Sequence, residues 1–83
     1  MSQISLETKS KLSPEGVIAA AKKKFVDELG LKITDEAECC LNLEGGGGFV
    51  YVQAEPQEKY TKVNIEGREW TFHIKKFAEE IAA

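Results

Sequence analysis

Hydrophobic residues recur along this chain at two spacings, one typical of strands and one typical of a helix. Ile4 and Leu6 alternate with polar residues, which predicts a short first strand over residues 3–8. From Val17 onward, apolar residues return every three or four positions. This spacing predicts an amphipathic helix at 14–29 whose apolar stripe packs on a sheet.

The predicted helix has recognisable signals at both ends. Ser13 can cap its free N–H groups, and Pro14 suits its first position. Gly30 stands just past its end, where a left-handed residue commonly closes a helix. Leu31 could then pack back on the last turn. We expect a further strand to begin at 31–34, with a turn or bulge at 35–37.

Four consecutive glycines, 45–48, separate two segments that both have strand patterns. Apolar residues alternate in 38–44, and both faces of 49–54 are apolar before Pro56 ends the strand. Glycine accepts positive φ at little cost, so the run predicts a β-hairpin tip. We expect this tip to be flexible and free of fixed contacts to the core. A phosphate loop is not favoured, because a strand and not a helix follows.

The segment after the last predicted strand, 60–66, can be interpreted in two ways. Trp70, Ile74 and Phe77 fit a helical stripe over 68–82, which we prefer because it accounts for more of the segment. Residues 70–74 also alternate, so a strand after a turn at Glu66-Gly67 stays open. The helix would bury Trp70 and leave Phe72 unexplained.

These elements predict an α+β fold in the order β-α-β-β-β-α, with two helices packed on one face of an antiparallel sheet of about four strands. We expect one domain over residues 1–83. The element order resembles a reduced version of the helix-grip sheet of lipid-binding and polyketide-cyclase-like domains.

Composition excludes some classes of function. The net charge is −3 over 83 residues, which argues against a nucleic-acid binder. The one basic run, Lys22 to Lys24, should pair with Asp27 and Glu28 on an outer helix face. No signal peptide and no membrane-length apolar segment is recognisable, so we expect no membrane partner and a cytoplasmic location.

The residues that could carry chemistry do not form a convincing catalytic set. Cys39, Cys40 and His73 lack the paired spacing of a structural zinc site, so we predict no metal, no cofactor and no catalytic residue. A disulfide between neighbouring cysteines would be strained, and reduced thiols fit the cytoplasm. Cys39 alternates with Leu41 as a core residue would, whereas Cys40 should be partly exposed. Enzymatic activity is therefore uncertain and disfavoured.

The strand at 49–54 offers the best candidate for a binding surface. If Val50 and Val52 face the helices, then Phe49, Tyr51 and the nearby Tyr60 lie on the open sheet face. The opposite orientation stays open. This face predicts a non-enzymatic module that binds a protein partner or a second copy of itself.

The alternative function is a small soluble domain that binds an apolar, lipid-like ligand. Its cavity would lie between the sheet and the helices. The residues expected to line that cavity are Phe25, Leu41, Trp70 and Phe77.

Overall fold

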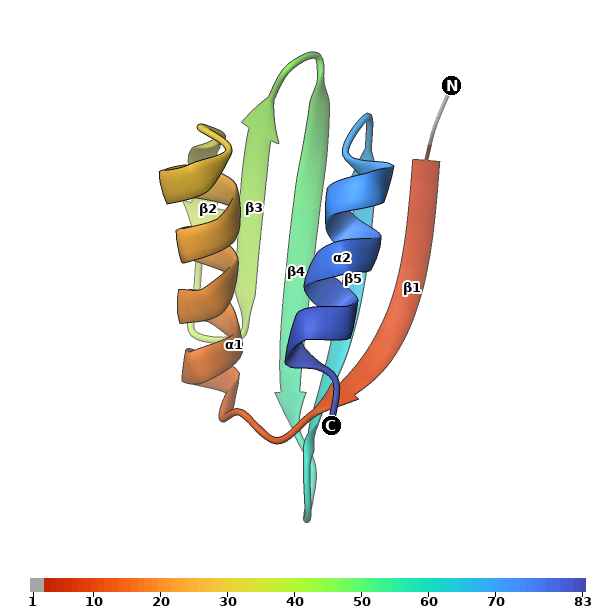
Figure 1. Cartoon of the computed structure of the whole chain (residues 1–83). Helices are drawn as coiled ribbons and strands as arrows, with labels where there is room; N and C mark the ends of the chain where they lie inside the picture. The colour runs from red at the N-terminus through yellow and green to blue at the C-terminus, as the bar shows by residue number, and fades with distance from the viewer. Residues whose placement is uncertain (1–2) are drawn as a thin grey trace.

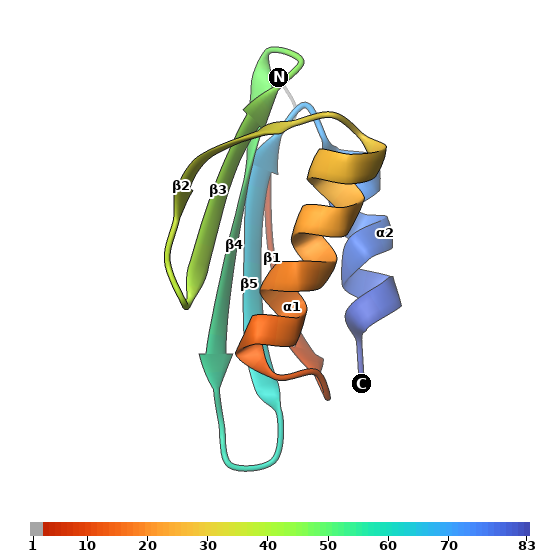
Figure 2. The ribbon, with the colours of Figure 1, turned by 90° about the vertical axis from the view of Figure 1, so that its left-hand side faces the viewer.

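Five antiparallel strands form one sheet, and two helices cover one of its faces (Figure 1). The computed structural model describes residues 3–83. The elements in chain order are β1 (Gln3–Ser10), α1 (Pro14–Ala21), its π-helical continuation η1 (Lys22–Glu28), β2 (Lys32–Glu36), β3 (Cys40–Gly45), β4 (Gly48–Pro56), β5 (Thr61–Arg68) and α2 (Thr71–Ile81). The strands lie in the order β1-β5-β4-β3-β2. Figure 2 shows both helices on the same side of this sheet.

The predicted α+β class is confirmed, with five strands instead of about four. A strand does begin within 31–34, as expected, but it forms a separate β2, so the element order is β-α-β-β-β-β-α and not β-α-β-β-β-α. All five of its residues are exposed, so it lacks the alternation that identifies a half-buried strand. A register shift between Ile33 and Asp35 marks a bulge in its pairing with β3, close to the turn or bulge expected from the sequence.

The first helix forms where the sequence predicted it. The Ser13 hydroxyl accepts a hydrogen bond from the Gly16 N–H at 3.0 Å, and Pro14 takes the first helical position. At the other end Gly30 has a φ of +79°. The Leu31 N–H donates to the Phe25 carbonyl at 2.8 Å, which turns the buried Leu31 back onto the helix end.

The core fills the space between the sheet and the two helices. Strand residues alternate, so that every second side chain of β3, β4 and β5 points toward the helices. Phe25 and Phe77 meet edge to face at the centre, with ring centroids 5.5 Å apart. The buried apolar residues are Val17, Ile18, Ala21, Phe25, Leu31, Leu41, Leu43, Val50, Val52, Ala54, Val63, Ile65, Ile74, Phe77, Ala78 and Ile81.

The glycine run forms the predicted hairpin, but its tip is held in place. Gly46 and Gly47 have φ values of +58° and +80°, as a two-residue turn between β3 and β4 requires. The indole N–H of Trp70 donates to the Gly45 carbonyl at 2.9 Å. The expectation that the tip makes no fixed contact is therefore wrong.

The last segment is a helix, although a shorter one than predicted. β5 continues to Arg68, so Glu66 and Gly67 lie inside a strand and the strand-and-turn alternative is wrong. α2 begins at Thr71. Trp70 precedes its first turn and is only partly buried, and Phe72 is 71% exposed. The alternative places Gly67 in a turn, but in the structure this glycine lies in a strand where Ile74 of α2 approaches closely.

The basic run on the first helix also differs from expectation. Lys22 pairs with Glu36 of β2, and Lys24 lies 3.4 Å from a carboxylate oxygen of Glu80 on α2. Among the described residues, these partners replace the same-helix acids Asp27 and Glu28. The lysines therefore link the first helix to two other elements.

Candidate functional site: the open face of the sheet

The side chains of β4 divide cleanly between the two faces of the sheet. Val50 and Val52 are fully buried under the helices. Phe49 and Tyr51 alternate with them, so they lie on the opposite face, where both are half-buried. The alternative orientation, with the aromatic residues facing the helices, is wrong.

An open groove of about 810 Å³ lies over these two aromatic residues. β2 forms one wall, since it curves to the side of the sheet that faces away from the helices (Figure 2). β5 forms the other wall, and the glycine turn closes one end. The lining residues are Lys32, Thr34, Asp35, Asn42, Glu44, Gly45, Gly47, Gly48, Phe49, Tyr51, Glu66 and Arg68.

Strand register surrounds the aromatic floor with charges of both signs. Phe49 lies between Glu44 of β3 and Arg68 of β5, its Cα partners on either side. Tyr51 lies between Asn42 and Glu66 in the same way. The groove therefore offers apolar area at its base and cationic and anionic groups on its walls. Such a surface can contact another protein.

Tyr60, the third aromatic residue expected on this face, does not line the groove. It stands just before β5, beyond the pair formed by Pro56 and Thr61 at the far end of β4. The Lys9 ammonium lies 4.9 Å from its ring centroid. The structure thus brings Phe49 and Tyr51 together and leaves Tyr60 at the opposite end of the sheet.

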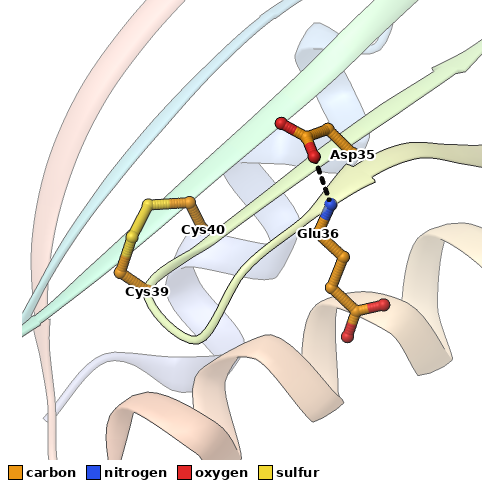
Figure 3. Close-up of a disulfide and its surroundings, with 4 residues drawn as sticks. All are labelled: Asp35, Glu36, Cys39 and Cys40. Carbon is orange, nitrogen blue, oxygen red and sulfur yellow. Dashed lines mark hydrogen bonds between the residues drawn. A yellow bond between two sulfur atoms is a disulfide. The ribbon is translucent and has the colours of Figure 1, made fainter.

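The cysteines and the histidine lie at separate places. Cys39 and Cys40 form a disulfide in the turn between β2 and β3 (Figure 3), so the expected free thiols are not found. His73 lies on α2, with its ring 5.8 Å from that of Trp70. Among residues 3–83, no group of three or more His, Cys, Asp or Glu side chains could hold a metal ion.

Two predictions about the cysteines are corrected by this arrangement. Cys39 is exposed and not a core residue, because β3 begins only at Cys40. The thiols also no longer support a cytoplasmic location, which stays a prediction. The adjacency of the two cysteines is the signal in the sequence for this disulfide, whereas the strain expected for such a small ring argues against it.

Comparison with known proteins identifies the fold and no family. No protein-family model and no curated protein matches the chain. A conserved protein of unknown function from Enterococcus faecalis superimposes with a TM-score of 0.65 at 14% identity, covering 98% of this chain and 71% of that one. The Aha1 dimer from Colwellia psychrerythraea, solved in solution, gives 0.61 at 16% identity, covering 98% and 96%.

Within residues 3–83, no helix has the length and apolar character needed to cross a bilayer.

Proposed function

We propose that this domain is a non-enzymatic self-association module that acts through the groove on its open sheet face. The observation that carries the proposal is the pair Phe49 and Tyr51, half-buried at the base of a groove on the face that no helix covers. Burying apolar surface in an interface contributes a favourable free energy of roughly 25 cal/mol per Å². Aromatic residues are also the types enriched at the centres of protein interfaces.

The charges on the walls fit a second copy of the same chain. Lys32 and Asp35 stand on β2, and Glu66 and Arg68 stand on β5. In a two-fold assembly each contact occurs twice, so one cation–anion pair across the interface brings a second with it. A surface with both signs of charge can match its own copy, whereas a surface of one sign would repel it.

The comparison with solved structures supports the proposal of self-association. The Colwellia psychrerythraea protein is an Aha1 dimer, and nearly all of that chain is covered by this one. A domain of this architecture can thus form a dimer. We extend that property to this chain as a proposal, on the strength of the groove.

The apolar-ligand alternative has less support. Phe25, Leu41 and Phe77 are buried in one continuous core, against which Trp70 packs. This packing favours a structural role for all four residues.

Sedimentation velocity of the full chain tests the proposal. The wild type should sediment as a dimer, and Tyr51→Lys should weaken the dimer at least ~30-fold, as loss of an interface hot spot does. Tyr51 points away from the core, so the variant should keep the wild-type circular dichroism spectrum. Tyr60→Lys is the matched control, because Tyr60 lies outside the groove, and it should remain dimeric.

Three results would contradict the proposal. One is a wild type that stays monomeric at high concentration. Another is equal weakening by Tyr51→Lys and Tyr60→Lys. The third is a folded, fully dimeric Tyr51→Lys variant.

A further inference from the structure

The disulfide between Cys39 and Cys40 lies at an exposed end of the sheet. The two residues belong to the tight turn that joins β2 to β3, in which the Ala37 N–H donates to the Cys40 carbonyl at 2.8 Å. Cys39 is exposed, and Cys40 is half-buried at the first position of β3. A small molecule in solution can therefore reach the Cys39 sulfur.

We propose that this pair is a reversible thiol–disulfide site, that it reacts in preference with uncharged or cationic small thiols, and that its oxidation state controls how firmly β2 is held on the sheet. The redox chemistry does not rest on the proposed self-association, although β2 also forms one wall of the groove. Three features carry the proposal: the adjacency of the cysteines, the charges around Cys39 and the position of the turn.

Adjacency makes the site reversible. After reduction the two sulfurs stay on neighbouring residues, so they remain close whatever the rest of the chain does. Closing the ring again requires almost no loss of chain entropy, because the loop between them is the shortest one available. A disulfide between distant residues would lack this advantage.

The exchange uses a small thiol as reductant and balances with two molecules of it. A thiolate attacks the Cys39 sulfur, a mixed disulfide forms there, and the Cys40 sulfur leaves as a thiolate that takes a proton from water. A second thiolate attacks the external sulfur of the mixed disulfide and releases Cys39, which is then protonated. The products are the protein dithiol and one molecule of the small disulfide, and the reverse reaction oxidises the pair.

The surroundings of Cys39 set which thiol reacts best. A hollow of about 390 Å³ beside it is lined by Glu15 of α1 and Glu38 of the turn. The other lining residues, Pro14, Ala54 and Pro56, carry no side-chain charge. An attacking thiolate that carries a further negative group is repelled by both carboxylates, and one that carries an ammonium group is not.

The turn connects the pair to the edge of the sheet. β2 pairs with β3 alone, and all its residues are exposed, so little core burial holds it. Besides its backbone pairing with β3, β2 is held by the turn, by the hydrogen bond from the Thr34 hydroxyl to the Asn42 carbonyl, and by the ion pair between Glu36 and Lys22. Opening the Cys39–Cys40 ring gives the turn more conformational freedom, so β2 should loosen before any other strand.

The first experiment measures reduction of the full-length protein by two thiols at low ionic strength, cysteamine (cationic) and 2-mercaptoethanesulfonate (anionic). Free thiols are trapped with iodoacetamide and counted by mass spectrometry. Glu38→Gln should speed the sulfonate reaction about 3-fold to 10-fold, because one repelling charge is removed. It should not speed the cysteamine reaction. Glu79→Gln, on α2, should change neither rate.

The second experiment follows amide hydrogen exchange in the oxidised and reduced protein. Reduction should speed exchange of the β2 amides, Lys32–Glu36, about tenfold or more and leave β5 unchanged. A Cys39→Ser/Cys40→Ser variant should match the reduced protein.

The redox site would be overturned by a pair that neither thiol reduces in the folded protein, or by a reduced pair that cystamine does not reoxidise. Equal β2 exchange in both forms would overturn the control of β2, and equal effects of Glu38→Gln on both thiols would overturn the charge selection.

Discussion

Replacing Gly67 with alanine should destabilise the domain by about 2–3 kcal/mol, the upper part of the range for overpacking a core. Gly67 lies inside β5, directly beneath α2. A Cβ at this position would lie 2.2 Å from the Ile74 Cδ1 atom and 2.7 Å from the Phe49 carbonyl oxygen. The Ile74 side chain can rotate away, but the Phe49 oxygen belongs to the backbone of β4. Relief therefore requires β4 and β5 to shift relative to each other.

Two further variants separate this clash from other effects of alanine. Gly47→Ala meets no heavy atom within 4 Å and suffers only from its φ of +80°, so it should cost about 1–2 kcal/mol. Ile74→Val removes Cδ1 and should cost about 0.5–1.5 kcal/mol in the wild type. In the Gly67→Ala background its cost should be smaller, because the same change relieves one clash.

Urea unfolding followed by far-ultraviolet circular dichroism gives the free energies of unfolding of the wild type, the three single variants and the Gly67→Ala/Ile74→Val double variant. The wild-type slope should be retained, so that shifts in the midpoint report stability. The reasoning would be refuted if Gly67→Ala cost less than about 0.5 kcal/mol, a typical value for a surface substitution. Strict additivity of Gly67→Ala and Ile74→Val would also refute it, since the two side chains would then not meet.

Three other variants, at two positions, test the ends of the elements. Trp70→Phe removes the hydrogen bond to the Gly45 carbonyl, so it should cost about 1 kcal/mol and speed amide exchange at residues 45–48, measured by NMR; unchanged exchange there would show that the indole does not hold the turn. Ser13→Ala removes the cap that accepts from the Gly16 N–H and should lower the free energy of unfolding by about 1 kcal/mol, whereas Ser13→Asp should retain most of it. Equal losses in the two Ser13 variants would argue against capping.

The parts of the fold that could be predicted are those in which sequence pattern and burial coincide. The first helix carried Ser13-Pro14 at its start and Gly30 after its end, and both signals depend on neighbouring residues. The alternation expected over 38–44 likewise matches the burial of Leu41 and Leu43 in β3. In these segments the residues that determine the local structure are close to one another in the sequence.

The remaining features depend on contacts between distant segments. β2 buries none of its residues, so no period gives its extent, and the sequence indicates only that a strand begins at 31–34. Gly67 reads as a turn residue until Ile74 of α2 is placed above it. Alternation with Val63 and Ile65 predicts that Tyr60 shares the open face with Tyr51, but strand register places Tyr60 beyond Pro56 at the far end of the sheet. The groove exists because β2 curves, and no short stretch of sequence specifies that curvature.

The pairing of β1 with β5 determines when the domain can be completed during synthesis. Gln3 pairs with Arg68, and the Ala83 N–H donates to the Lys9 carbonyl at 2.8 Å. β1 must therefore wait after synthesis until β5 has been made, while β2 to β5 can pair with neighbours as they emerge. Contacts between segments so far apart close large loops and tend to form late. Until then β1 presents an unpaired edge, which makes the nascent chain, more than the finished protein, the form most exposed to aggregation.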